Sequence, residues 1–333
     1  MRITLGEGNT PLVESRRIAR ELGIARLLFK LEGANPTGSY KDRFIAAELA
    51  RLLAHGARAC VATSSGNTGA SLAAYAARYE IACTIVVSDA TPAGKLVQMA
   101  AHGARLIKVK DFTTDAKVTQ RVLALLQEHS QARCAPLVVS AYRYCPVGMA
   151  GVESLGLELA AAQAGHVFVP SGSGGLFIAT ARGLAGTGTR VHAVQPEGCS
   201  TFVAAFGRGD NLIVPVVSRT RVSGLSVPFD IDATLALAEL RVGGGLGFAA
   251  SDDAIFTAQA MMAELEGIYA EPAGAAALAA LGQALRSGAI AKTDSAICVV
   301  SGHGFKDSDA AARLAARHPA VAATVEELGD VLG

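Results

Sequence analysis

The chain has 333 residues, 51% of them hydrophobic and 18% charged, a balance typical of a folded globular protein and not of a disordered one. Its formal net charge is +1, with no block of like charge, so neither nucleic acid nor an anionic membrane surface is expected as a partner. The length predicts two domains, and no apolar stretch reaches the roughly 18 residues of a membrane-spanning helix.

The first informative helix begins at Lys41. This lysine closes the run Asn35-Pro-Thr-Gly-Ser-Tyr40 and opens a segment whose apolar residues recur at helical spacing as far as Leu53. A helix start fixes the direction of the lysine, so its amine points at one place. Flanked by Asp42 and Arg43, Lys41 is equally consistent, on spacing alone, with an ordinary surface lysine.

Short apolar runs then alternate with longer helical ones. Thr91-Pro92 supplies a residue that caps a helix start and a proline at the first helical position. The predicted strands of this region are 59–63, 81–87, 105–109 and 136–140. The predicted helices are 68–79, 92–102 and 114–129.

The alternation resumes after Gly148. A less regular, glycine-rich segment, 207–247, precedes two final helices, and Ser251 caps the first of these. The other elements predicted here are helix 151–164, strand 167–169, a helix from Gly175, strand 191–195 and a last strand 296–300. Repeated β-α-β units imply parallel sheets with helices on both faces, and ligands of such sheets bind at the carboxyl ends of the strands.

Two strand-end loops are rich in small polar residues. Thr63-Ser-Ser-Gly-Asn-Thr-Gly69 opens a helix and presents N–H groups and hydroxyls to an anion. For this loop alone, a capped helix start without a ligand is the favoured interpretation. Pro170-Ser-Gly-Ser-Gly-Gly-Leu176 lets the backbone approach a phosphate closely. It matches neither the P-loop nor a full G-x-G-x-x-G, and a tight structural turn is an equally good interpretation.

Two further segments are unremarkable when read singly. Val299-Val-Ser-Gly-His-Gly-Phe-Lys-Asp307 ends a strand with a hydroxyl and two glycines, and by itself it reads as a turn with a surface histidine. Glu271 precedes an alanine-rich helix with Pro272 at its first position, where its carboxylate favours the helix dipole.

Together, in this order and behind Lys41, the four segments resemble the fold type II pyridoxal-phosphate (PLP) enzymes of the tryptophan synthase β-subunit superfamily. The resemblance runs over nearly the whole chain, from Glu7-Gly-Asn-Thr-Pro-Leu12 onward. It implies two three-layer α/β domains with parallel-rich sheets and PLP in the cleft between them. Residues 46–148 would form a smaller mobile domain and residues 1–45 plus 149–333 a larger PLP-binding one. Closure of the smaller domain would exclude water.

The resemblance also implies a role for individual residues. Lys41 would hold the cofactor as a Schiff base and shuttle protons, Asn67 would contact the pyridine 3′-oxygen, and Ser301 would bond the pyridine nitrogen. The cofactor phosphate would be cradled by Gly172, Ser173, Gly174, Gly175 and Leu176. The substrate carboxylate and nearby groups would be held by Ser64, Ser65 and Thr68. A neutral hydroxyl at the ring nitrogen leaves a weaker electron sink, which suits elimination and replacement.

Within this superfamily, the segments 35–41 and 301–307 are most similar to threonine synthases. These lyases convert O-phosphohomoserine and water into threonine and phosphate. The substrate phosphate then needs cationic and hydroxyl groups in a dry site. Arg143 is the first candidate for this role, and Ser140, Thr68 and Lys95 are further ones.

Two departures keep other reactions open. Threonine synthases usually carry Asn-Ser and a longer segment before that arginine, whereas Val139-Ser140 stands here. The loop 172–175 is more like those of dehydratases and β-replacement enzymes, and Glu271-Pro-Ala-Gly also occurs in threonine/serine dehydratases. The alternatives are therefore a dehydratase or β-replacement enzyme acting on serine, threonine or an activated serine derivative, and a non-catalytic ligand-binding paralogue.

The remaining expectations concern partners and location. An amino-acid substrate and a homodimer follow from the resemblance. Six cysteines without a C-x-x-C pair indicate a reduced cytoplasmic protein, and seven histidines without an H-x-x-x-H pair indicate no metal site. The amino terminus lacks the pattern of a signal peptide.

Overall fold

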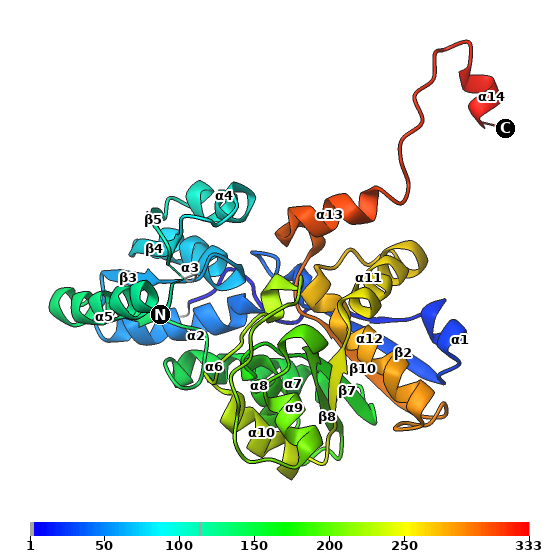
Figure 1. Ribbon diagram of the computed structural model, residues 1–333, viewed down its shortest axis with the longest axis horizontal. Helices are drawn as coiled ribbons and strands as arrows, with labels where there is room; N and C mark the ends of the chain where they lie inside the picture. The colour runs from blue at the N-terminus through cyan, green and yellow to red at the C-terminus, as the bar shows by residue number, and fades with distance from the viewer. Residues whose placement is uncertain (1–2, 113–114, 333) are drawn as a thin grey trace.

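The computed structural model describes residues 3–112 and 115–332. Within them the chain forms two sheets with helices packed around them (Figure 1). The six-stranded sheet has the order β1 (Leu12–Glu14), β2 (Arg26–Leu31), β10 (Ser295–Val300), β7 (His166–Pro170), β8 (Arg190–Pro196), β9 (Gly247–Ala250). The four-stranded sheet has the order β5 (Arg105–Val109), β4 (Ala82–Ser88), β3 (Ala59–Ala62), β6 (Leu137–Val138).

Strand pairing is parallel at every pair seen in the described ranges except β1 with β2. Parallel strands covered on both faces are buried along their whole length, and all five residues of β7 are buried in this way. The predicted α/β class with parallel-rich sheets is therefore confirmed. The strands of the four-stranded sheet all lie within residues 59–138 and those of the six-stranded sheet outside them; the division into a 46–148 domain and a 1–45 plus 149–333 domain stays a prediction.

The helices vary from one turn to five. In the described residues they are α1 (Ile18–Leu22), α2 (Lys41–Ala54), α3 (Asn67–Arg78), α4 (Ala93–Ala101), α5 (Ala116–Arg133), α6 (Pro146–Val152), α7 (Ser154–Ala160), α8 (Gly175–Gly183), α9 (Phe202–Arg208), α10 (Ala233–Val242), α11 (Asp252–Glu266), α12 (Pro272–Ser287), α13 (Ser308–Ala315) and α14 (Leu328–Leu332). Short 3-10 turns η1 to η4 lie at Glu32–Ala34, Glu197–Cys199, Ser223–Leu225 and Gly304–Lys306. None of the described helices is long and apolar enough to cross a membrane.

Three expectations about helices are wrong, and one lies partly outside the described residues. Helix α4 begins at Ala93, because Pro92 keeps an extended ψ of 137° and Thr91 is held in a turn on Ser88. The single helix expected over 151–164 is broken into α6 and α7, where the Ser154 hydroxyl donates to the Gly151 carbonyl at 2.7 Å and competes with the helix ladder. The expected start of α5 at Thr114 lies outside the described residues.

The third error is in the glycine-rich segment 207–247, which contains a ten-residue helix, α10. Its alanines and leucines favour a helix, and the glycines at 243–245 follow it instead of interrupting it. Asp230 accepts the backbone N–H of Thr234 at 3.1 Å and the Thr234 hydroxyl at 2.6 Å, which stabilises the helix start.

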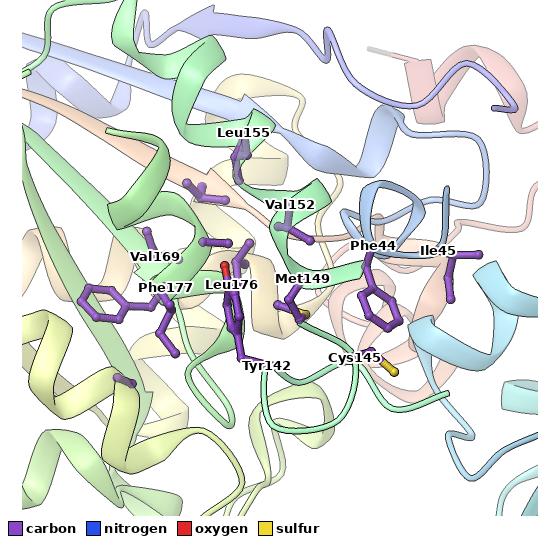
Figure 2. Close-up of a cluster of buried hydrophobic side chains, with 14 of the residues drawn as sticks. Phe44, Ile45, Tyr142, Cys145, Met149, Val152, Leu155, Val169, Leu176 and Phe177 are labelled. Carbon is purple, nitrogen blue, oxygen red and sulfur yellow. The ribbon is translucent and has the colours of Figure 1, made fainter. Parts of the chain in front are cut away.

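A buried apolar cluster joins the helix that begins at Lys41 to the rest of the molecule. Figure 2 shows Phe44 of α2 beside Met149 and Val152 of α6, with Leu176 of α8 nearby, and all four side chains are buried. Helices α2 and α6 approach so closely that a Cβ atom at Gly151 would lie 2.5 Å from the Ala47 Cβ. The direction of the first turn of α2 is therefore fixed by dense packing.

A chain of hydrogen bonds between two histidines crosses the amino end of the six-stranded sheet. The Leu246 N–H donates to His192 Nδ1 at 3.0 Å, His192 Nε2 lies 2.9 Å from His166 Nδ1, and His166 Nε2 lies 3.2 Å from Asp294 Oδ2. Because the Leu246 N–H can only donate, His192 accepts at Nδ1 and donates at Nε2, and both rings are neutral. Burial, with the neighbouring His166 and Arg190, lowers the pKa of His192 to about 3.

This arrangement predicts a loss of stability in acid. Below about pH 6.5 His192 is protonated in the unfolded chain but stays neutral in the folded protein. The free energy of unfolding therefore keeps the full contribution of His192 above that pH and loses it as the pH falls toward 3. The free energy of unfolding should fall by up to about 1.4 kcal/mol per pH unit from this one site. Urea unfolding of wild type and His192→Gln at several pH values measures it, and equal slopes for the two proteins would refute the assignment.

Candidate active site

Loops from both sheets meet around a cavity of about 900 Å³. Its wall includes residues 63–68 after β3, residues 139–141 after β6, Pro170 and residues 172–176 at the end of β7 and beyond it, and Ser301 after β10, together with Lys41 at the start of α2. The cavity therefore lies at the carboxyl ends of parallel strands, where this class of fold binds its ligands.

Most of the predicted site residues are brought together here. Those that line the cavity are Lys41, Ser64, Ser65, Asn67, Thr68, Lys95, Ser140, Gly172, Ser173, Gly174, Gly175, Leu176 and Ser301. Their roles remain predictions, but the arrangement places an amine, several hydroxyls and a glycine loop around one space.

Arg143 is the exception, and the structure does not support its predicted role. Its side chain is exposed, lies outside the cavity wall, and stands over the Tyr144 ring with the guanidinium carbon 5.9 Å from the centroid. The buried carboxylate of Asp232 accepts the backbone N–H groups of Tyr142 and Arg143 at 2.8 and 3.1 Å. It is thus the backbone of Arg143 that is turned inward, while the side chain is turned to solvent.

The amine of Lys41 is held by hydroxyl groups. Its Nζ donates to Ser140 Oγ at 2.7 Å, and Ser140 Oγ lies 3.0 Å from Thr68 Oγ1. The Tyr40 ring lies beside the amine, with its centroid 4.5 Å from Nζ. These neighbours give the amine one defined position on the wall of the cavity.

The turn before Lys41 is fixed by its neighbour Asp42. This carboxylate accepts the N–H and the hydroxyl of Thr37 at 2.7 and 2.6 Å and the hydroxyl of Ser71 at 2.5 Å. Burial raises the pKa of Asp42, and those hydrogen bonds act to lower it. The Tyr40 N–H also donates to the Ser301 carbonyl at 3.1 Å, so the turn is tied to the end of β10.

The glycine loop after β7 has the shape of an anion cradle. Gly174 has φ +109°, and a Cβ there would lie 2.5 Å from the Ala236 Cβ, so this position requires glycine. Helix α8 starts directly after it and points its amino end, with unpaired N–H groups and a partial positive charge, at the cavity. The side chain of Gln195, on β8, supports the loop by donating to the Gly172 carbonyl at 2.9 Å.

Two residues that the sequence did not mark as functional also line the cavity. Glu271 is only 7% exposed, and both its carboxylate oxygens accept from Asn67 Nδ2, at 3.0 and 3.2 Å. Burial raises the pKa of Glu271 to about 7. The prediction that its carboxylate serves the helix dipole therefore misses its main contact.

The second residue is Lys306, from the turn after β10. Its Nζ donates to the Thr37 carbonyl at 3.0 Å and to Gln98 Oε1 of α4 at 2.5 Å. Burial lowers the pKa of Lys306, while Glu271 and Asp42 act to raise it. Lys95, also on α4, donates to Ser223 Oγ at 3.0 Å, so both lysines bridge α4 to other parts of the wall.

The donor set fits pyridoxal phosphate. Lys41 supplies a primary amine, the glycine loop at α8 fits a phosphate, and the hydroxyl of Ser301 and the amide of Asn67 stand on the same wall. Within the described residues, no cluster of three or more histidine, cysteine or carboxylate side chains is arranged to hold a metal ion.

Comparison with known proteins agrees with this geometry. Residues 3–302 match the family described as pyridoxal-phosphate dependent enzyme. The chain is 33% identical to threonine synthase of Methanocaldococcus jannaschii, over 93% of this chain and 78% of that protein. It is 31% identical to threonine synthase of Mycobacterium tuberculosis (strain H37Rv), over 93% and 85%. A solved structure of threonine deaminase from T.th. has a TM-score of 0.74 and 29% identity, over 91% of this chain and 94% of that one.

The chain belongs to the family of pyridoxal-phosphate dependent enzymes, and PLP is its cofactor. Within that family it is a threonine synthase-like enzyme, because relatives carrying that name share about a third of its sequence over nearly its whole length. The predicted superfamily, cofactor and class of enzyme are confirmed.

Proposed function

We propose that this enzyme is a lyase that converts O-phosphohomoserine and water into threonine and inorganic phosphate. The observation that carries the proposal is the composition of the cavity wall. Two further lysines, Lys95 and Lys306, line the same cavity as Lys41. A cavity with one amine for chemistry and two more cations suits an amino acid with a phosphate at its far end. The similarity to threonine synthases supports the same substrate.

The cofactor supplies the electron sink that stabilises negative charge next to the amino-bearing carbon. The residues of the chain do the rest. Lys41 removes the α-proton and returns protons to the substrate, and its contact with Ser140 holds the amine in place between transfers. Ser64, Ser65 and Thr68 bind the substrate carboxylate from the amino end of α3. The hydroxyl of Ser301, on the same wall, would bond the pyridine nitrogen of the bound cofactor.

The substrate phosphate is bound by Lys95 and Lys306 and not by Arg143. Both lysines reach the cavity, and each already makes a hydrogen bond that an anionic ligand could replace. Ser140 and Thr68 lie next to Lys41 and contribute hydroxyl groups to the wall of the same cavity.

This assignment predicts opposite results for two positively charged residues. Lys95→Ala should lower kcat/KM for O-phosphohomoserine by about tenfold to a hundredfold, because a charge-assisted hydrogen bond is lost. Arg143→Ala should leave kcat/KM nearly unchanged, since that side chain is in solvent. Steady-state phosphate release measures both, and a large loss in Arg143→Ala with none in Lys95→Ala would contradict the assignment.

The smaller domain is also proposed to close over the cavity when the substrate binds. Residues 46–148 would move as the smaller domain, and the Lys95–Ser223 contact spans from α4 to the 223–225 turn outside that range. We also propose a cytoplasmic homodimer, in keeping with the unpaired state of the cysteines in the described residues. Light scattering of the purified protein tests the dimer.

A dehydratase or β-replacement enzyme acting on serine, threonine or an activated serine is the second candidate. One observation favours it: the threonine deaminase structure is 29% identical to this chain and shares its fold. The hypothesis of a non-catalytic ligand-binding paralogue has no such support, because Lys41 and the glycine loop are both in place.

A panel of substrates separates the candidates. The enzyme is incubated with O-phosphohomoserine, phosphoserine, O-acetylserine, serine and threonine, while phosphate, 2-oxo acids and the cofactor spectrum are followed. Phosphate release from O-phosphohomoserine far exceeding turnover of the other four supports the proposal. Preferred turnover of serine or threonine to a 2-oxo acid, or of O-acetylserine, would replace it with the second candidate.

A further inference from the structure

The carboxyl group of Glu271 lies inside the cavity wall and contacts one side chain at close range. Glu271 directly precedes α12, and both of its oxygens accept from Nδ2 of Asn67, which is the first residue of α3. The two residues are 204 positions apart in the chain. This contact therefore joins two of the loops that form the site.

A third loop makes room for the contact. A Cβ atom at Gly302 would collide with Glu271 Oε1, so only glycine leaves space for the carboxyl group. The Glu271 N–H donates to the Gly302 carbonyl at 3.1 Å, which fixes the backbone from which the side chain extends. The position of the carboxyl group is thus fixed by the space that Gly302 leaves and by the hydrogen bonds of the Glu271 backbone and side chain.

The chemistry of the pair fixes how the amide of Asn67 is turned. In its ionised form, which predominates above about pH 7, the carboxylate of Glu271 only accepts hydrogen bonds, so the nitrogen of the amide, and not its oxygen, faces Glu271. Nδ2 of Asn67 carries two N–H groups, and because Asn67 lines the cavity, the second N–H can face the cavity while the first donates to the carboxylate. Without Glu271 the amide is free to turn over and present its oxygen instead.

The charges around the carboxyl group come from several elements. Lys306 of η4 and Lys41 of α2 favour its ionised form, whereas burial and Asp307 oppose it. The carboxyl group is buried, and its one direct side-chain partner in the described residues is Asn67.

We propose that Glu271 is a positioning residue that turns the amide of Asn67 so that its second N–H faces the 3′-oxygen of the bound cofactor. The affinity of the protein for PLP then depends on Glu271 even though Glu271 acts through Asn67. The inference rests on the proposed contact between Asn67 and the cofactor, and it is independent of which amino acid the enzyme converts.

The test measures PLP binding to apoenzyme, by fluorescence titration, in Glu271→Ala, Glu271→Gln, Asn67→Ala and the double variant Glu271→Ala/Asn67→Ala. Glu271→Ala should weaken binding about tenfold, the effect of one well-oriented hydrogen bond. Glu271→Gln keeps an acceptor oxygen and should bind nearly as tightly as wild type. The double variant should bind no more weakly than Asn67→Ala alone, because the two residues act as one unit.

Any one of four results would overturn the inference. Three of them are wild-type affinity in Glu271→Ala, a loss in Glu271→Gln as large as in Glu271→Ala, and a double variant whose loss is the product of the two single losses. Wild-type affinity in Asn67→Ala would also overturn it, together with the Asn67 contact on which it rests. None of these results bears on the substrate, so failure here is distinguishable from failure of the proposed reaction.

A second variant keeps the test decisive if Glu271→Ala does not fold, as judged by circular dichroism and thermal unfolding of the apoenzyme. Gly302→Ala displaces the same carboxyl group from the opposite side. It should weaken PLP binding in the wild-type background and have no further effect in Asn67→Ala. An equal loss in both backgrounds would contradict the inference.

Discussion

Replacing Lys41 by alanine should reduce turnover by at least about a thousandfold, because the group that moves protons to and from the substrate is removed. The visible absorbance of the lysine-linked cofactor should disappear at the same time. The fold should persist, since Lys41 is the first residue of α2, alanine is a good helix former, and the amine contacts only groups of the cavity wall.

Absorbance spectra, phosphate release and thermal unfolding of Lys41→Ala measure these effects together. Lys117→Ala, on the exposed surface of α5, is the matched control and should behave as wild type. Retained absorbance and turnover in Lys41→Ala would show that another amine holds the cofactor.

Replacing Arg43 by alanine should have the largest effect on stability. The Arg43 Nε and Nη2 donate to the two carboxylate oxygens of Glu32, both at 2.8 Å, and its Nη1 donates to Glu158 at 2.6 Å. Glu158 also accepts from Lys30 at 2.6 Å. Burial raises the pKa of Glu158, but hydrogen bonds from Arg43 and Lys30 outweigh it and hold that pKa at about 2.

Loss of the guanidinium leaves Glu32, which is fully buried, without its cation. Removal of one partner from a buried ion pair typically costs about 3 to 5 kcal/mol. We expect the free energy of unfolding of Arg43→Ala to fall by that amount in urea titrations. Arg208→Ala, which breaks a half-exposed pair with Asp210, should lose about 0 to 1 kcal/mol. Similar losses in the two variants would contradict the role of the buried network.

The same network explains why the motif around Lys41 extends beyond the lysine. Glu32 also accepts the hydroxyl of Thr10 at 2.6 Å, and Asn35 Oδ1 accepts the Gly8 N–H at 2.9 Å. The amino-terminal segment 7–12 is therefore bound to the turn that carries Lys41. Two stretches that the sequence shows as separate motifs form one structural unit.

Local patterns were sufficient to predict much of the fold, whereas the cofactor was predicted from the resemblance of the combined motifs to fold type II PLP enzymes. Apolar residues at helical spacing after Lys41 predicted α2, and alternating strands and helices predicted the parallel sheets. In contrast, β1, β2 and β9 were missed. The first two are at the amino end, where no β-α-β repeat marks them, and β9 directly follows the glycines at 243–245.

Contacts between distant parts of the chain could not be predicted in this way. Arg143 points outward because Asp232, 89 residues later, binds its backbone N–H. Glu271 and Lys306 enter the site through partners more than 200 positions away. One sequence signal for Glu271 was present: the helix after it consists largely of alanine, leucine and glycine on all sides, a pattern typical of a buried helix, and Glu271 directly precedes its first turn.

The most direct test of the proposed reaction is isotopic. The purified PLP-containing enzyme is incubated with O-phosphohomoserine in H₂¹⁸O, and products are identified by mass spectrometry and phosphate assay. The proposal predicts threonine in equal amount to phosphate, with one ¹⁸O atom in its hydroxyl group. Release of phosphate with 2-oxobutanoate in place of threonine, or no release of phosphate at all, would contradict it.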